Sequence, residues 1–367
     1  MQFGLNESQE FLRDSARKFF AGECTIADVR RLMETETAFE ANLWAKLAAQ
    51  GYTGVIFPEE FGGVGLGIVE LILLMEEAGR ALLPGPFFST VVIAGSLLDA
   101  LATWEQKMKY LAPICHGEAR ATVAFFEADG SWDLADVCLT AANGRLHGEK
   151  LFVPDAAVAD WIVIVAQNGV FVVEAKAHGV LVKPMLGMDL TRKLYSVRFD
   201  NVLGEKLGET AGLATPRGIA TVALAAEMVG GMQRTLDLTV EYAKTRKQFG
   251  KPIGMFQAVQ HQCADMYLET ESARSAVYYA AWALQHHAAD AAAAVSIAKL
   301  YASEASRTVG NRGIQVHGGM GFTWENDLHL YYRRAKASET AFGDATFHRE
   351  RLARMTIDAQ TVSAQRT

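Results

Sequence analysis

The run Gln315-Val-His-Gly-Gly-Met-Gly-Phe-Thr-Trp324 is the stretch around which the rest of this chain is interpreted. Helical patterns flank it, so its glycines predict a tight connection whose backbone can approach a ligand closely, because no Cβ atom intervenes. Free backbone N–H groups at the start of a helix attract phosphate, and Gln315 adds an amide beside them. A plain helix–helix turn is the simpler alternative, so this run alone is compatible with either role.

A second motif lies upstream, in Tyr242-Ala-Lys-Thr-Arg-Lys-Gln-Phe-Gly-Lys-Pro-Ile-Gly254. It places Arg246 and Phe249, followed by Gln257, around a tight turn between two long predicted helices. An arginine beside an aromatic residue suits a dinucleotide, because the guanidinium group binds pyrophosphate through two hydrogen bonds while the ring packs on a flat heterocycle. The structural alternative for Arg246 is a cation at a helix C-terminus, where it interacts favourably with the helix dipole.

Together, the motifs Arg246-x-x-Phe249-Gly250 and Gln315-x-x-Gly318-Gly319-x-Gly321 make the chain resemble the acyl-CoA dehydrogenase family, flavoenzymes that desaturate acyl-CoA thioesters. The resemblance covers essentially the whole chain. It implies FAD as cofactor, an acyl-CoA substrate that passes a hydride from Cβ to the flavin, and a carboxylate that removes the α-proton. It also implies an electron-transfer flavoprotein as electron acceptor, and a tetramer in which two subunits touch each flavin.

The resemblance assigns cofactor roles to particular residues. Arg246, Phe249 and Gln257 stand where the family contacts the FAD of a neighbouring subunit. The residues that stand where the adenine and pyrophosphate end is received are Gln315, Gly318 and Gly319.

The bulk properties are those of a soluble enzyme. A chain of 367 residues predicts two or three domains, and a net charge of -7 argues against a general nucleic-acid binder. The four cysteines include no C-x-x-C pair, which indicates thiols in a reducing compartment. No secretory signal and no apolar run long enough for a membrane span are visible, so we expect a cytoplasmic protein. No His-Glu-x-x-His spacing occurs, so no metal site is predicted.

The patterning predicts a multidomain α and β protein in the order helical, β, helical. Residues 1–117 indicate an N-terminal helical domain. Residues 118–208 contain short β-rich runs, with hairpin signals at Asn143-Gly144 and Asn168-Gly169, and predict a central antiparallel, β-barrel-like domain. Residues 209–367 predict a C-terminal four-helix bundle. Its long alanine-rich segments are Ile219–Tyr242, Phe256–His286 and Ala289–Gly310. The acyl-CoA dehydrogenase architecture has the same order.

The β-rich region departs from the family pattern. Where the family has Thr-Glu-Pro-Gly-Ala-Gly-Ser-Asp along the flavin and CoA, this chain has Phe126-Glu-Ala-Asp-Gly-Ser-Trp-Asp133, with Trp132 at the usual small serine. Phe152 keeps the aromatic side chain that the family places over the isoalloxazine. Pro154 stands where the family supplies a hydroxyl near flavin N5, and a proline has neither that hydroxyl nor a backbone N–H.

The catalytic base is the largest departure. Removing a proton alpha to a thioester needs a carboxylate, which most family members place directly before the glycine of a Tyr-Glu-Gly-Thr motif. That position is Phe342 here, and the position used by a minority of members is Ala220. Two substitutes remain: Asp344, two residues further on, and Glu227, seven residues after Ala220 on the same helix face. The structural alternatives are a helix N-cap for Asp344 and a glutamate paired within the bundle for Glu227.

The sequence supports two hypotheses of different class, within a homo- or hetero-tetramer. The first is an enzyme that carries out FAD-dependent α,β-desaturation of an acyl-CoA. The second is a non-catalytic or half-site partner in a heterotetramer, which lends Arg246, Phe249 and the Gln315–Gly319 loop to a flavin whose base comes from a sister chain. A third, more distant hypothesis is a family member that uses its flavin for a different oxidation.

Overall fold

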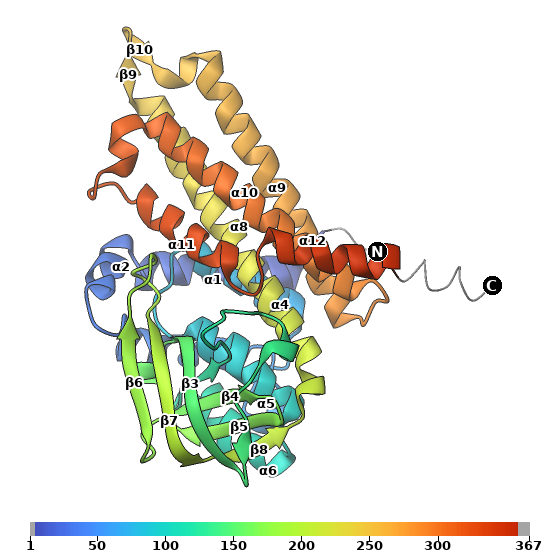
Figure 1. Ribbon diagram of the computed structural model, residues 1–367. Coiled ribbons are helices and arrows are strands. Elements are labelled where there is room, and N and C mark those ends of the chain that lie inside the picture. Colours follow the sequence, from blue (N-terminus) through green and yellow to red (C-terminus); the bar gives the residue numbers. More distant parts are fainter. Residues whose placement is uncertain (1–3, 359–367) are drawn as a thin grey trace, which may run out of the picture. The chain divides into compact units, whose positions relative to one another are not determined.

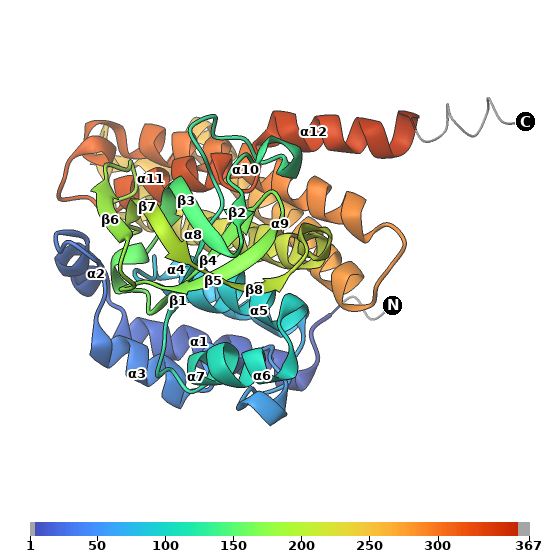
Figure 2. The ribbon, with the colours of Figure 1, turned by 60° about the horizontal axis from the view of Figure 1, so that its bottom comes forward.

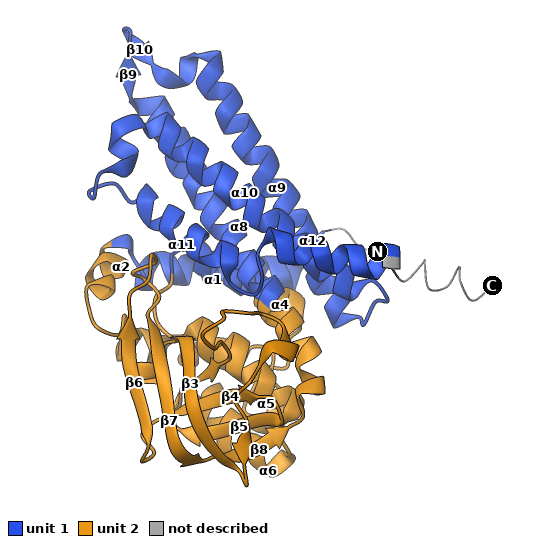
Figure 3. Cartoon of the chain, viewed as in Figure 1, with its two compact units in different colours: residues 1–26, 72–82, 221–367 blue, residues 27–71, 83–220 orange. Residues whose placement is uncertain are grey.

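The protein is described over residues 4–358 by a computed structural model, and its chain forms two compact units (Figure 3). The first unit comprises residues 1–26, 72–82 and 221–367, and the second comprises residues 27–71 and 83–220. Along the chain the order of elements is helical, β, helical, which confirms the predicted fold class (Figure 1). The boundaries of the three domains expected from the sequence remain a prediction.

Short helices and two β-sheets make up the second unit. Its α-helices are α2 (Ile26–Met33), α3 (Ala41–Ala49), α5 (Ser96–Leu101), α6 (Trp104–Gln106) and α7 (Ala112–Cys115). Its strands are β1 (Ala121–Ala124), β2 (Ala141–Ala142), β3 (Arg145–Pro154), β4 (Trp161–Ala166), β5 (Gly169–Glu174), β6 (Val180–Met185), β7 (Leu194–Leu203) and β8 (Glu205–Gly208). Figure 2 shows β4, β5 and β8 as neighbours in one sheet, with α5 close to β8.

The strands form two separate four-stranded sheets, in the orders β1-β4-β5-β8 and β2-β3-β7-β6. The β region is therefore not closed into a barrel. It is also not wholly antiparallel, because β1 pairs with β4 in parallel, through a connection long enough to contain β2 and β3. Both predicted hairpins are confirmed: β2 pairs with β3 across Asn143-Gly144, and β4 turns into β5 at Gln167 and Asn168.

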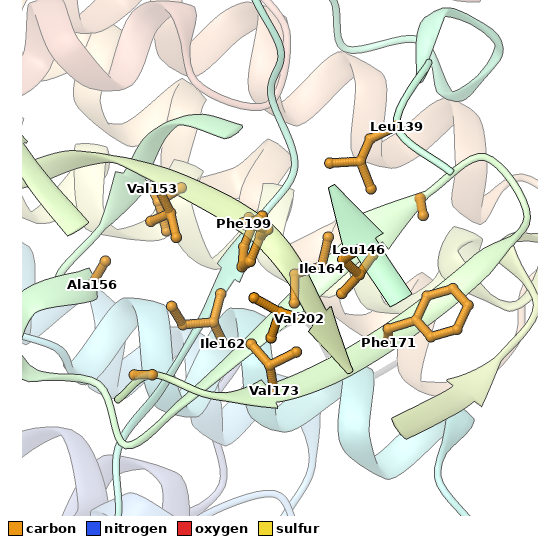
Figure 4. Close-up of a cluster of buried hydrophobic side chains, with 14 of the residues drawn as sticks. Leu139, Leu146, Val153, Ala156, Ile162, Ile164, Phe171, Val173, Phe199 and Val202 are labelled. Carbon is orange, nitrogen blue, oxygen red and sulfur yellow. The ribbon is translucent and has the colours of Figure 1, made fainter. Parts of the chain in front are cut away.

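The core of this β region is a cluster of apolar side chains contributed by both sheets (Figure 4). Alternate residues of β4, Ile162 and Ile164, and of β5, Phe171 and Val173, belong to it, together with Phe199 of β7. Alternation sends every second side chain of a strand to the same face, so each sheet presents one apolar face to the cluster. The arrangement is a sandwich of two sheets.

Long helices dominate the first unit. Its helices are α1 (Glu7–Glu23), the part of α4 (Ile68–Arg80) from residue 72, the part of α8 (Ala214–Thr245) from residue 221, α9 (Gln257–Gln285), α10 (Ala291–His317), α11 (Leu328–Thr340) and α12 (Ala345–Ala353). α10 contacts α9, α11 and α12, and it extends past the expected end at Gly310 to His317. No helix within residues 4–358 is long and apolar enough to cross a membrane.

Within the first unit, α4 and α8 cross with their backbones in contact. A Cβ atom added to Gly230 would lie 1.8 Å from the carbonyl oxygen of Glu76, and one added to Gly79 would lie 2.0 Å from that of Glu227. Both distances are far below van der Waals contact, and both neighbours are backbone atoms that cannot swing away. The crossing therefore depends on glycine at both positions.

We expect Gly230→Ala to lower the free energy of unfolding by about 3 kcal/mol, because the added methyl group forces the two helices apart. Gly231→Ala is the matched control: its Cβ would lie 4.0 Å from the nearest atom, on Tyr331. Since alanine is the better helix former, this control should be neutral or more stable by up to about 1 kcal/mol. Guanidinium unfolding followed by circular dichroism measures both, and equal stability of the two variants would contradict the proposed crossing.

Candidate functional site

A two-residue hairpin turn projects from the end of α8 (Figure 1). β9 (Lys247–Gln248) pairs antiparallel with β10 (Lys251–Pro252), and the turn residues Phe249 and Gly250 have φ angles of 52° and 76°. Positive φ at both central positions is typical of a type I′ turn, which normally prefers Asn-Gly. Phe249 is also 91% exposed, so neither backbone preference nor burial within the described chain explains a phenylalanine here. Such strain points to a role in contacting something outside the chain.

Arg246 lies immediately before this hairpin. Its amide donates to the carbonyl of Tyr242 at the end of α8, and its own carbonyl accepts from the amide of Ile253, so its backbone is held on both sides. The side chain is exposed and forms no hydrogen bond or ion pair with any residue from 4 to 358. Gln257, the first residue of α9, is exposed as well. The cation that the sequence singled out is thus available to an anionic ligand.

The glycine loop lies at the end of α10 and is tied to the end of α8. The imidazole of His317 stacks on the ring of Tyr242, with centroids 4.3 Å apart and planes 21° apart. Its Nδ1 lies 2.8 Å from the carbonyl oxygen of Gly313. Burial lowers the pKa of His317, so the ring is neutral at pH 7 and donates from Nδ1. Because Tyr242 lies one helical turn before Arg246, this stack brings the two sequence motifs to the same end of the helices.

Open space lies in front of the glycine loop. Gly318 has φ 60° and ψ −140°, and a Cβ atom added to Gly318 or to Gly319 would have no neighbour within 4 Å. Gln315, on the last turn of α10, is exposed beside them. A backbone without side chains, an exposed amide and an exposed guanidinium group at one end of a bundle can receive a ligand that carries phosphate.

The first predicted base, Asp344, lies in the turn between α11 and α12. Two consecutive residues before it are left-handed, Phe342 with φ 59° and Gly343 with φ 96°. Asp344 is exposed and caps α12, because its side chain accepts a hydrogen bond of 2.8 Å from the amide of Phe347. The capping role is the structural alternative weighed for this residue. It leaves the second carboxylate oxygen outside this hydrogen bond.

The second predicted base, Glu227, is in a different environment. Its Oε1 lies 2.8 Å from Nη1 of Arg334 on α11, and the two residues are 3% and 5% exposed. They line a cavity of about 20 Å³, shared with Ser338, which is the size of a single water site. A buried carboxylate paired with a guanidinium group is held in place by that partner. A pairing within the bundle is the structural alternative to a catalytic role that the sequence analysis gives for Glu227.

The β region of the second unit carries the predicted Phe152 in a strained conformation. Phe152 has φ 53°, lies where the register of β3 against β7 is irregular, and is 43% exposed. Its ring lies 6.2 Å from that of Phe126, which meets Trp132 edge to face at 4.0 Å. Arg217 completes the cluster, because its guanidinium group donates to the carbonyl of Trp132 at 2.7 Å. The tryptophan that replaces the family's small serine is therefore the centre of a packed aromatic cluster.

Sequence reasoning missed three residues that organise these sites: Tyr242, Lys299 and Arg334. Lys299 is fully buried on α10, beneath the turn that carries Asp344. The available signal was its place in an apolar helical stripe with Val295 and Ala302, where a charged side chain is unusual. Within residues 4–358 no group of three or more His, Cys, Asp or Glu side chains could hold a metal ion.

Two family models match this chain. The model of the acyl-CoA dehydrogenase N-terminal domain matches residues 6–118, and the model of the acyl-CoA dehydrogenase C-terminal domain matches residues 219–357. The acyl-CoA dehydrogenase IpdE2 of Mycolicibacterium smegmatis is 34% identical over 357 residues, which cover 96% of this chain and 98% of that protein.

Two solved structures are also similar over nearly the whole chain. The Tcur3481-Tcur3483 steroid ACAD has a TM-score of 0.88 and 32% identity, covering 97% of this chain and 99% of that one. PigA with FAD and proline has a TM-score of 0.89 and 27% identity, over the same shares of the two chains.

We expect Phe249→Asn to raise the melting temperature, because asparagine tolerates the left-handed conformation that strains phenylalanine by about 1 kcal/mol. Gln248→Asn is the matched control, since Gln248 is exposed in the same hairpin and has no positive φ. Differential scanning calorimetry compares the two variants. A melting temperature of Phe249→Asn at or below that of the control would show that the turn is not strained.

Proposed function

This chain belongs to the acyl-CoA dehydrogenase family, and we propose that it binds FAD and oxidises the Cα–Cβ bond of an acyl-CoA thioester, with electrons passing to an electron-transfer flavoprotein. The observation that carries this proposal is the joint surface at the end of the long helices. There the strained hairpin with Arg246 and Phe249 is tied through the Tyr242–His317 stack to the glycine loop. As a member of this family the protein is an oxidoreductase that acts on CH–CH groups.

The exposed residues of this surface fit the dinucleotide end of FAD. Arg246 supplies a cation for the pyrophosphate, Phe249 supplies a ring for a flat heterocycle, and Gly318 and Gly319 leave space for close approach. All of them face solvent, which supports a cofactor shared with a neighbouring subunit in a tetramer. Similarity to PigA, a protein solved with FAD, supports the same cofactor. Phe152, exposed and strained in the β region, is proposed to cover the flavin ring.

When bound, FAD supplies the acceptor for the hydride that leaves Cβ. The protein must remove the proton from Cα, which requires a carboxylate that is accessible and not neutralised by a partner. Glu227 does not meet this requirement, because it is buried and paired with Arg334. We therefore propose Asp344 as the base, since it is exposed and lies two residues from Phe342, where most family members carry the glutamate.

The proposed substrate is an acyl-CoA with a bulky, ring-bearing acyl group. The similarity to a steroid ACAD over 97% of this chain supports it.

A second candidate function rests on Phe342 and Trp132. A phenylalanine at the family's base position and a tryptophan in place of a small serine both favour a half-site role, in which a sister chain of a heterotetramer carries the base. The visible spectrum and native mass of the chain expressed alone separate the two functions. A yellow tetramer that cholyl-CoA, butyryl-CoA or palmitoyl-CoA bleaches anaerobically is a complete enzyme, whereas a colourless or unbleached protein is a partner subunit.

We expect Arg246→Ala to lose most of its FAD, because the pyrophosphate loses its bidentate partner. Lys247→Ala is the matched control: it removes a neighbouring exposed cation and should keep its flavin. The ratio of flavin absorbance to protein after gel filtration measures both, together with the native mass. Full FAD occupancy in Arg246→Ala would rule out the assigned pyrophosphate site.

Asp344→Asn should bind FAD normally but slow flavin reduction by acyl-CoA about a hundredfold or more, because an amide cannot accept the α-proton. Glu227→Gln should retain flavin reduction and instead melt at a lower temperature, because Arg334 loses its charged partner. Anaerobic stopped-flow absorbance and thermal melting separate the two. Normal reduction in Asp344→Asn with loss in Glu227→Gln would reverse the assignment.

A further inference from the structure

A buried lysine lies beneath the turn that carries Asp344. Lys299 of α10 is 0% exposed, and its Nζ donates hydrogen bonds to the carbonyl oxygens of Glu339 and Gly343, each 3.0 Å away. A third hydrogen bond, of 2.9 Å, goes to Oγ of Ser303. The three donors of the ammonium group thus meet three acceptors, and two of these acceptors are backbone carbonyls at the end of α11 and in the turn.

His348 holds the adjoining carbonyl of the same turn. Its Nε2 lies 3.0 Å from the carbonyl oxygen of Phe342, while its Nδ1 is buried and has no partner within residues 4–358. The proton therefore belongs on Nε2, which donates. Burial, reinforced by the charge of Lys299, lowers the pKa of His348 to about 4, so the ring stays neutral at physiological pH.

The turn that these two side chains hold is strained. Phe342 and Gly343 both have positive φ, a conformation that costs energy for a phenylalanine and persists only where the surroundings impose it. Lys299 and His348 bind the carbonyls of these two consecutive residues. Those hydrogen bonds lie between the end of α11 and the N-cap of α12 at Asp344.

We infer that Lys299 is the positioning residue for this turn and, together with His348, fixes the direction in which residues 342–344 present Asp344. The inference rests on the proposed function, in which Asp344 is the base, and it adds the residue that aims this base. Lys299 touches neither the substrate nor the cofactor in this role and acts through the backbone of the turn.

The choice of lysine supports this role, because a buried ammonium group is costly and an apolar side chain would pack there more simply. Burial lowers the pKa of Lys299 to about 7, while the charges of Glu339 and Asp344 oppose that shift. The other titratable group beside it, His348 of α12, is neutral. The donors of Lys299 serve Glu339 and Gly343, whose carbonyls would otherwise be buried without these partners.

Lys299→Met tests the inference, because methionine removes the donors and keeps an unbranched side chain. We expect hydrogen–deuterium exchange at the amides of Phe347 and His348, which bond to Asp344, to accelerate about tenfold or more. Flavin reduction by the fastest of cholyl-CoA, butyryl-CoA and palmitoyl-CoA should slow about a hundredfold. The FAD content and the acyl-CoA concentration at half-maximal rate should not change.

Ser303→Ala is the matched control, because it removes the third acceptor and leaves the carbonyls of Glu339 and Gly343 bonded to Lys299. Ser303→Ala should match the wild type in hydrogen–deuterium exchange and in the rate of flavin reduction. A Lys299→Met protein with the same exchange and rate as Ser303→Ala would overturn the inference. Exchange needs no turnover, so a wild type that cholyl-CoA, butyryl-CoA and palmitoyl-CoA all fail to bleach would refute the proposed function separately. If Lys299→Met does not fold, His348→Phe is tested in its place, because it removes the hydrogen bond to the carbonyl of Phe342. Unchanged hydrogen–deuterium exchange at the amide of Phe347 in that variant would also overturn the inference.

The pH dependence of stability gives a further readout. The pKa of Lys299 in the folded chain, about 7, lies below the ordinary lysine value of 10.5. Between these values the unfolded chain binds more protons, so this group adds stability as the pH rises. The melting temperature of the wild type should therefore rise relative to that of Lys299→Met between about pH 7 and pH 10. A constant difference would show that no buried amine titrates at this position.

Discussion

The close approach of α4 and α8 is the constraint on which the helical unit depends. Gly79 and Gly230 let the backbones of these two helices touch, and α11 is then held to both of them. Tyr331 of α11 donates its hydroxyl to the last carbonyl of α4 at 2.9 Å, while Arg334, one turn further on, pairs with Glu227 of α8. The position of α11, and of the turn at its C-terminal end, follows from a contact that only residues without side chains permit.

Left-handed backbone conformations occur at several positions in this chain, and three of them are phenylalanines that the sequence analysis names. Three phenylalanines have left-handed backbones: Phe152 in the β region, Phe249 in the hairpin and Phe342 at the family's base position. Phenylalanine is unfavourable in this conformation, and two of the three side chains are also substantially exposed. Burial does not offset this cost for Phe249, which is 91% exposed, and offsets only part of it for Phe152, which is 43% exposed. The three phenylalanines lie at the proposed flavin and base positions. Strained backbone conformations cluster at functional sites, so this agreement fits the proposed function.

Burial separates the two carboxylates that could act as base. Glu227 lies inside the bundle, where a charged group needs a partner of opposite charge. Arg334 is that partner, and its ion pair with Glu227 engages the carboxylate. Asp344 lies at the surface as the N-cap of α12, where its side chain accepts a hydrogen bond from the amide of Phe347. The position that the resemblance implies for the base thus holds Phe342 and not a glutamate. The nearby carboxylate of Asp344 follows a turn whose carbonyls accept hydrogen bonds from buried side chains. Lys299 is buried and bonds to the backbone of the turn before Asp344, so it belongs to none of the sequence motifs.

The sequence by itself determined the features that short-range chemistry controls. Helical and strand periodicity predicted the order of the elements, and the Asn143-Gly144 signal predicted a hairpin that the structure confirms. These are decided by residues close together in the chain, since backbone preference and amphipathic spacing act over a few residues.

Only the tertiary structure decided which distant segments meet. The parallel pairing of β1 with β4, the two open sheets, the crossing at Gly230, and the partners of Glu227 and Lys299 each join residues far apart in sequence. A buried charge takes its role from the group that packing places against it. No local pattern specifies that group, so the lysine and the glutamate could be recognised as unusual but not assigned a partner until the fold brought their neighbours together.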